Sequence, residues 1–215
     1  DANYRRLMRV RICLSAAGAI VPFFIAFAVD VWGFKDAIAA TFITVQILSQ
    51  MGGSFLSGWI SDRLGNRKLL VVSGITLLAT SVFAAVGTYL TPAGGVTVFG
   101  HLITWRLLVM MACFVGSGVF MSQLFPAYTN YLIDIAPRRK LPSYIGFGSG
   151  FTVPIAAAPM VFGWVSTSYG YRPIFVIASV LSVVGLYLSR QMGEPRDGIV
   201  GDDEQVAQEA KEDSD

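Results

Sequence analysis

Residues 58–68 read GWISDRLGNRK and separate two long uncharged stretches of the chain. Each flanking stretch, 37–61 and 69–105, exceeds the ~20 apolar residues that span a bilayer. A glycine in such a short segment allows a tight reversal, and one before it permits close approach of helices. The segment therefore predicts a short polar loop between two membrane helices. Its glycines and charged residues are Gly58, Asp62, Arg63, Gly65, Arg67 and Lys68.

The same alternation of apolar stretches and short charged breaks runs through most of the 215 residues. Charged side chains make up 14% of the chain, against ~25% in typical soluble proteins, and mean hydropathy is +0.60. The net charge of +2 excludes a generic nucleic-acid binder. We expect an all-α integral membrane protein, a six-transmembrane-helix bundle occupying residues 1–190. The predicted helices are about 10–29, 37–60, 69–90, 107–132, 142–166 and 173–190.

Charge is segregated along the chain and across the predicted membrane. Residues 190–215 carry nine acids against three cations, so 191–215 is predicted to be an acidic, disordered tail. With six helices, thirteen lysines and arginines fall on the side of both termini and three on the other side. Because cytoplasmic loops collect Lys and Arg, both termini are predicted to be cytoplasmic.

The ends and the cysteines of the chain add three expectations. The chain begins with Asp1 and a basic run, without a signal-peptide cleavage pattern. We therefore expect a piece of a longer protein that starts in a cytoplasmic linker. Cys13 and Cys113 lie within predicted helices and are interpreted as small packing residues. We expect neither a disulfide framework, nor a metal site, nor a cofactor.

The 58–68 segment resembles the signature loop of the major facilitator superfamily, G-x-x-x-D-R-x-G-R-[KR]. The glycines, Asp62 and the cations match in order, whereas Asn66 stands where the family often has arginine. The junction 126–139 and residues 170–173 (GYRP) also resemble the family, so the likeness covers about 5–190. The resemblance implies one half of a twelve-helix fold built from two six-helix repeats.

The basic run before the first helix and the acidic tail after the sixth favour the C-terminal half, helices seven to twelve. The resemblance then implies a secondary transporter that moves a small solute by alternating access, in an inner or plasma membrane of bacterial type. Its partners would be the lipid bilayer, the small-molecule substrate and the missing N-terminal half.

Three other kinds of protein compete with a transporter half as interpretations of the sequence. A six-helix half-transporter that dimerises, and a channel or non-transporting receptor on the same fold, remain open. An intramembrane serine enzyme is excluded, because Ser117 in a Gly-Ser-Gly triplet has no histidine on a later helix. The sole histidine, His101, precedes that helix.

In the family, the first and fourth helices of each half line the central cavity, and the second and fifth face the other half. Gln46 and Gln50 lie on one face of the second helix with Gly53 and Ser57. Structural hydrogen bonding, aromatic packing and interfacial tyrosines are the competing interpretations of these positions. The candidates for the substrate cavity are Phe23, Phe24, Phe27, Gln46, Gln50, Gln123, Tyr128 and Asn130.

The fifth predicted helix carries Gly146 and Gly150, four residues apart, and then Pro154. Such a pair permits close helix packing, which suits a face that moves against the other half.

Asp134, at the cytoplasmic end of the fourth helix, is expected to pair with Arg67 or Arg63. Asp62 would then contact the missing half, and these contacts would hold the cytoplasmic gate. No acid lies at a predicted midplane, which favours a neutral or amphipathic substrate and places no proton site in this half.

Overall fold

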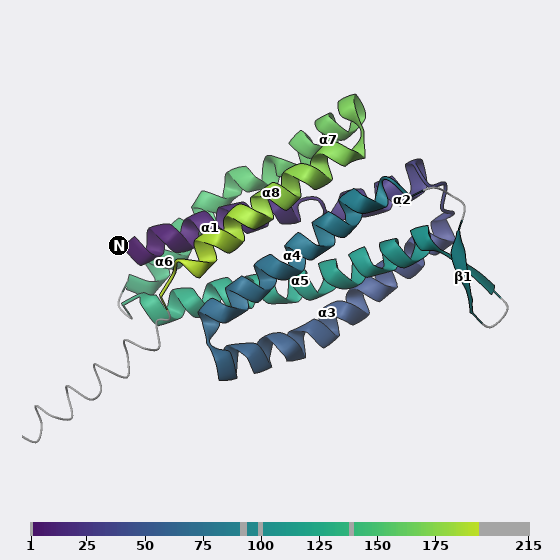
Figure 1. Ribbon diagram of the computed structural model, residues 1–215. Helices are drawn as coiled ribbons and strands as arrows, with labels where there is room; N and C mark the ends of the chain where they lie inside the picture. Colours follow the sequence, from purple (N-terminus) through teal and green to yellow (C-terminus); the bar gives the residue numbers. More distant parts are fainter. Residues whose placement is uncertain (1, 91–93, 99–100, 138–139, 194–215) are drawn as a thin grey trace, which may run out of the picture.

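The computed structural model describes residues 2–90, 94–98, 101–137 and 140–193, and nearly all of them are helical. Six helical segments of this part of the chain are long and apolar enough to cross a membrane, which confirms the six predicted spans. The predicted acidic tail lies outside the described residues from 194 onward. The long helices run side by side in Figure 1. In chain order the elements are α1 (Ala2–Gly18), α2 (Val21–Asp30), α3 (Asp36–Leu64), α4 (Asn66–Gly87), β1 (Gly95–Val98), β2 (His101–Thr104), α5 (Trp105–Ile135), α6 (Leu141–Thr152), the 3₁₀ helix η2 (Val153–Ala157), α7 (Ala158–Tyr169) and α8 (Tyr171–Arg190).

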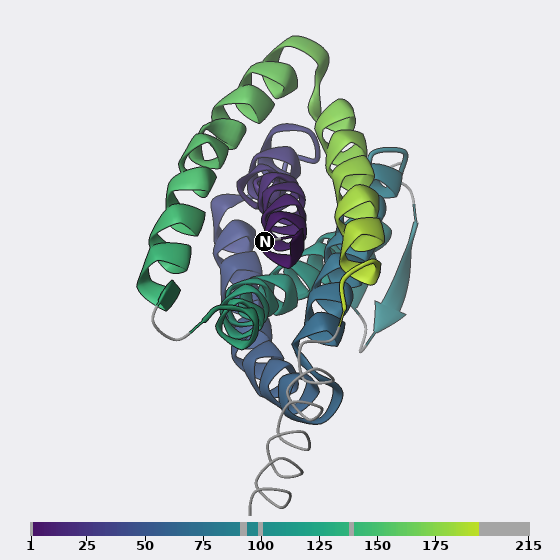
Figure 2. The ribbon, with the colours of Figure 1, turned by 90° about the vertical axis from the view of Figure 1, so that its left-hand side faces the viewer.

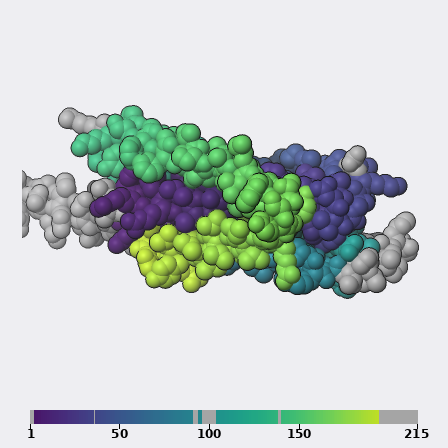
Figure 3. All heavy atoms as spheres, turned by 90° about the horizontal axis from the view of Figure 1, so that it is seen from above, coloured from purple at the N-terminus to yellow at the C-terminus, as the bar shows by residue number. Residues whose placement is uncertain are grey.

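The helices pack as a bundle in which two of the six spans are far less buried than the others. α5 packs against α3 and α4, and α8 packs against α4 and α1. α1 lies between α6–α7 and α8, as Figures 2 and 3 show. In the most apolar stretch of α3 only 11% of the residues are buried, and the same holds for the span 141–169. The corresponding share is 44% for the first, third and fourth spans, so the second and fifth spans are left largely uncovered.

Two of the six spans are interrupted, although the sequence predicts each as a continuous helix. α1 ends at Gly18 and α2 begins at Val21, because Pro22 has no N–H and its ring collides with the carbonyl four residues earlier. Between them, the N–H groups of Ala19 and Ile20 bond to carbonyls three residues back. In the fifth span, Pro154 lies in η2, a tighter 3₁₀ stretch between α6 and α7.

Aromatic side chains from four spans form the centre of the core. Phe24 lies 5.6 Å from Phe175 and 6.1 Å from Phe114, measured between ring centroids. Phe114 stacks on Phe42 at 5.1 Å. Phe27 packs edge-on against Phe175. Offset and edge-on pairs of this kind add to the burial of apolar area, so this cluster ties the first, second, fourth and sixth spans together.

Close approach of α3 and α5 depends on missing side chains. A Cβ on Gly118 would collide with the backbone carbonyl of Gln46. One on Gly53 would collide with the Ser122 hydroxyl. Small residues at the contact let the two backbones approach, as in other membrane helix pairs. The predicted polar face of α3 is therefore partly a packing face, with Gly53 and Ser57 buried against α5.

A short antiparallel hairpin connects α4 to α5, with Val96 opposite Ile103. The sequence predicts only a turn at 91–95, most of which lies outside the described residues. The strands are not predicted. After them, the Thr104 hydroxyl accepts a hydrogen bond from the Leu107 N–H and caps the start of α5.

Candidate functional site

The loop that interrupts the two uncharged stretches is a single residue long in the structure. α3 ends at Leu64, α4 begins at Asn66, and Gly65 between them has a φ of 92°. Side chains are strained in that region of backbone space, so glycine is required for this turn. The Gly65 N–H closes α3 by bonding to the Ser61 carbonyl at 3.2 Å. The predicted tight reversal is confirmed.

A hydrogen-bonded chain of side chains joins α3, α4 and α5 beside this turn. The Ser61 hydroxyl donates to the Asn66 side-chain oxygen at 2.6 Å, and the Asn66 amide donates to Asp134 at 2.6 Å. The Asn130 amide donates to the Ser61 oxygen at 3.3 Å. Asn66 is 1% exposed, so its amide bridges two helices inside the protein. The position that departs from the family pattern is thus the centre of this chain.

The structure gives Asp134 a different partner from the arginines that the sequence predicts. The Arg67 guanidinium donates instead to the Arg190 carbonyl of α8, at 2.7 Å. The last carbonyls of a helix lack intrahelical donors, so a nearby arginine satisfies one of them. Arg63 lies over the Trp59 ring, 5.6 Å from its centroid. The expected pairing of Asp134 with Arg67 or Arg63 is therefore replaced by the bond from Asn66.

A polar cavity of about 290 Å³ opens between α3 and α5 next to this chain. The predicted close helix approach at Gly58 is not made within the described residues, since a Cβ there would meet nothing within 4 Å. Asp62 and Lys68 are exposed. The residues that line the cavity are Ser54, Ser57, Gly58, Ser61, Asp62, Ser122, Pro126 and Asn130.

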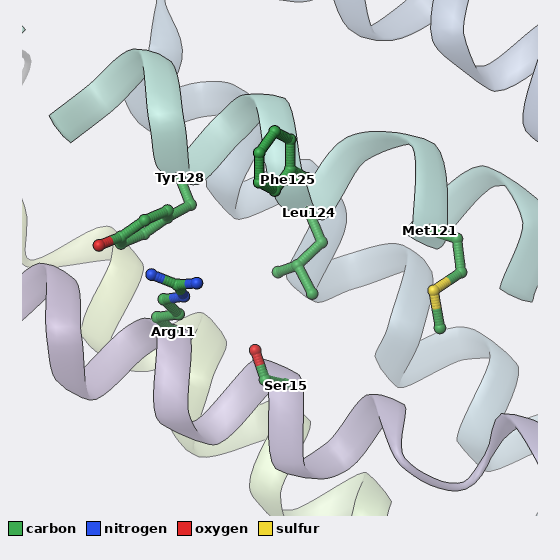
Figure 4. Close-up of a pocket in the computed structure, with 6 residues that line it drawn as sticks. All are labelled: Arg11, Ser15, Met121, Leu124, Phe125 and Tyr128. Atoms are coloured by element: carbon green, nitrogen blue, oxygen red, sulfur yellow. The ribbon is translucent and has the colours of Figure 1, made fainter. Parts of the chain in front are cut away.

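A second cavity, of about 170 Å³, lies between α1 and α5 and is shown in Figure 4. α1 contributes Arg11 and Ser15, which are one helical turn apart and share a face. The Arg11 guanidinium lies over the Tyr128 ring, 3.8 Å from its centroid. The remaining wall comes from α5 and is apolar: Met121, Leu124 and Phe125.

The structure distributes the predicted cavity residues over several environments. Tyr128 lines the α1–α5 cavity, and Asn130 lines the polar cavity beside the loop. Gln50 is exposed on α3, and Gln46 is half-buried where its carbonyl faces Gly118. Gln123 is fully buried, and within the described residues neither its amide nitrogen nor its oxygen has a hydrogen-bond partner.

The three phenylalanines of the first span belong to packing contacts. Phe24 and Phe27 are 0% and 2% exposed and form part of the aromatic core. Phe23 packs edge-on against Phe162 of α7 at 6.3 Å. The rings of Phe24 and Phe27 lie in the core because aromatic side chains of α3, α5 and α8 surround this part of α2, whereas Phe23 is half-buried against α7. None of the three lines a cavity described above.

The predicted packing pair of the fifth span faces away from the rest of the chain. A Cβ on Gly146 or Gly150 would meet nothing within 4 Å, and Pro154 is exposed. Gly148, between them, is the glycine that packs inward, against the hydroxyl groups of Tyr128 and Tyr4. Residues two apart on a helix point to nearly opposite sides, so an inward Gly148 turns the pair outward.

Two features of the site were missed by reasoning from sequence. Arg11 falls at the start of the predicted helix 10–29, whereas the first span of the structure begins at Asn3 and places Arg11 two turns inside it. The spacing of Arg11 and Ser15 by four residues was the available signal for a shared polar face. Asn66 stands out in the sequence only as a departure from the family pattern, and its bridging role has no signature there.

Comparison with known proteins agrees with this architecture. The profile of the Major Facilitator Superfamily matches residues 10–207. The proline/betaine transporter of Escherichia coli K12 is 24% identical over 167 residues, which cover 74% of this chain and 31% of that protein. The glycine betaine/proline/ectoine/pipecolic acid transporter of Dickeya dadantii is 22% identical over the same length.

Among solved structures, a D-xylose–proton symporter superposes with a TM-score of 0.68 at 14% identity, which shows likeness of fold alone. The match covers 99% of this chain and 52% of the symporter. The chain spans about a third of the length of the curated relatives, 31% in each case. The profile match, together with six spans in this arrangement, shows that the chain is an integral membrane protein and belongs to the Major Facilitator Superfamily.

Proposed function

We propose that the full protein is a secondary transporter that moves a small solute by alternating access, and that this chain is its C-terminal six-helix half. The observation that carries the proposal is the pair of uncovered spans, α3 and the span 141–169. Large apolar side chains stand out from both, such as Phe55 at 83% and Met160 at 78% exposure. α1 and α5, with the cavity between them, lie between these flanks. A second six-helix half placed against α3 and the span 141–169 would close that cavity into a path across the membrane.

The proposed substrate is small and either net-neutral or amphipathic. The relatives in Escherichia coli and Dickeya dadantii are named for proline, betaine, ectoine and pipecolic acid. Those solutes are compact and carry balanced charge at neutral pH. The α1–α5 cavity combines apolar, aromatic and hydroxyl groups with one cation, Arg11, which suits such a solute better than a large or highly charged one.

We place both termini in the cytoplasm, in an inner or plasma membrane of bacterial type. The excess of Lys and Arg on the terminal side of the six helices supports this orientation. Residues 191–215, which carry most of the acids of the chain, would then form an acidic cytoplasmic tail.

The cytoplasmic gate in this proposal consists of the 58–68 loop and Asp134. Asp62 is exposed beside the polar cavity on α3, where the other half would dock. Contacts made in only one conformation shift the equilibrium between inward-open and outward-open states. Asp62→Asn and Asp134→Asn should therefore alter both transport and cytoplasmic accessibility. Wild-type values of both quantities in both variants would remove the gating role.

The test is solute flux by the full-length protein in proteoliposomes, with radiolabelled glycine betaine and L-proline as the first probes. Saturable uptake that is accelerated by unlabelled solute on the opposite side is expected. A linear conductance without counterflow would instead indicate a channel. Counterflow by a homodimer of the six-helix chain would assign a half-transporter.

A further inference from the structure

We infer that Arg11, with Ser15 and the ring of Tyr128, forms a subsite for a single carboxylate group of the transported solute. The inference rests on the proposed transport function and deepens it, since it names the chemical group that the α1–α5 cavity recognises. Arg11 is a charged side chain within a membrane span.

Arg11 lies inside the apolar part of the bundle. Its ring partner Tyr128 is eight residues beyond Phe120, the middle of α5, which is about 12 Å along the helix axis. With α5 centred in the bilayer, that depth falls within the ~15 Å half-thickness of the hydrocarbon core. A cation at such depth is costly and therefore faces a partner or a water-filled cavity. Within the described residues Arg11 has no carboxylate partner, and its guanidinium faces the cavity of Figure 4.

The contacts with Tyr128 use only part of the Arg11 guanidinium, which carries five N–H donors. The guanidinium carbon is 3.8 Å from the ring centroid, and Tyr128 itself is only 5% exposed, so the ring provides a fixed wall. The N–H donors that are not directed at Tyr128 can serve a ligand in the cavity that Arg11 lines. Two parallel N–H groups match the two oxygens of a carboxylate.

Ser15 supplies a further donor at the same place. Ser57, Ser122 and Ser182 return their hydroxyl groups to carbonyls of the preceding turn. The Ser15 hydroxyl makes no such bond, nor any other within the described part of the chain. It lies one turn from Arg11 and lines the same cavity, so it is free to donate to an anion held by the guanidinium.

The rest of the cavity defines the other end of the ligand. Met121, Leu124 and Phe125 offer apolar surface, and the Phe125 ring is 70% exposed. Two other arginines of α1, Arg5 and Arg9, line a separate cavity between α1 and α6. One cation beside an apolar wall suits a compact solute with one carboxylate and an apolar or quaternary ammonium body, and it disfavours a phosphate or a dicarboxylate.

The experiment measures binding to the purified full-length protein with matched pairs of probes that differ at the carboxylate. The pairs are glycine betaine and choline, L-proline and L-prolinamide, and pivalate and pivalamide. We expect the wild type to prefer the carboxylate in at least one pair. Arg11→Gln should weaken binding of that carboxylate roughly 10- to 100-fold and leave its partner unchanged. Arg11→Lys should retain part of the preference, and Arg6→Gln, which removes an exposed charge of the same helix, should retain all of it.

Two results would overturn the inference: a wild type without preference in any pair, and a preference that survives in Arg11→Gln. If the preference survives while thermal stability falls, Arg11 pairs with an acid of the other half instead. Flux measured on the same preparation distinguishes failure of the subsite from failure of the proposed transport function. Flux without carboxylate preference leaves the transporter standing and removes the subsite. Arg11-dependent preference without flux supports the subsite and removes the transport function.

Discussion

At the residue scale, the chemistry of position 66 explains how a charged loop is anchored without a buried ion pair at that position. Removing two charges from water is costly, and an arginine buried at this turn would need a well-placed acid. The Asn66 amide avoids that cost and still offers one acceptor and two donors. It uses the acceptor for Ser61 and one donor for Asp134, so three helix ends are fixed by a neutral group.

Asn66→Ala should lower the free energy of unfolding by about 1–3 kcal/mol, because it leaves Asp134 and Ser61 without their partner. The measurement is thermal unfolding of the purified full-length protein in detergent. Lys68→Ala, two residues further on an exposed position, is the matched control and should stay within about 0.5 kcal/mol of wild type. Equal stabilities for the two variants would contradict the bridging role.

Gln123 presents the opposite case, a buried amide that has no partner within the described residues. An unpaired buried amide costs about 1–3 kcal/mol, whereas an apolar side chain of similar shape does not. Gln123→Met should therefore raise the unfolding temperature, while Gln50→Met at an exposed position should not. A destabilised Gln123→Met would show that the amide is satisfied in the full-length protein, and a flux assay on the same variant would then test for contact with the solute.

At the scale of elements, α3 and α5 pack closely along one face of each helix, and Gly53 of α3 and Gly118 of α5 permit this contact. The interrupted spans behave differently. Proline breaks α1–α2 and α6–η2–α7, and these are the spans on either side of the groove that contains Tyr4 and Phe147. The bundle therefore combines a closely packed pair of helices with two spans whose helical hydrogen bonding is interrupted.

Gly118→Ala and Gly52→Ala should change stability in opposite directions, although both lie within long helices. A Cβ at Gly118 collides with the Gln46 carbonyl of α3, so the helices must separate at a cost of about 1–3 kcal/mol. A Cβ at Gly52 meets nothing within 4 Å and gains up to about 1 kcal/mol of helix propensity. Thermal unfolding of the two variants side by side checks this, and a stabilised Gly118→Ala would refute the close contact.

At the scale of the whole molecule, burial differs between spans: 44% of the most apolar stretch is buried in the first, third and fourth spans, against 11% in α3 and in the span 141–169. The proposed docking of a second half requires this pattern, because it would cover the second and fifth spans. The charged residues also gather at one end of the bundle, because the 58–68 loop and the end of α5 lie at the end that holds the N-terminus (Figure 1).

The proposed orientation makes a direct prediction for labelling of intact cells. In a background with Cys13 and Cys113 replaced by serine, Lys35→Cys should react with a membrane-impermeant maleimide added outside, and Lys68→Cys should react only after the cells are opened. Both positions are exposed, so the difference reports sidedness and not burial. The reverse pattern would invert the assigned topology.

Sequence by itself determined the spans and the turn between the second and third. Hydropathy and charge need no partner to act, because an apolar stretch prefers lipid wherever it packs, and a one-residue reversal needs glycine whatever surrounds it. It could not assign Phe24 and Phe27 to the core, Gln123 to a site without a partner, or Asn66 to the centre of a polar chain. Those outcomes depend on which helix faces which, and helical periodicity says only which residues share a face. Arg11 shows the difference most clearly: the sequence predicts only that it lies in the first turn of the first helix, and the approach of α5 places its guanidinium over the Tyr128 ring and beside a cavity.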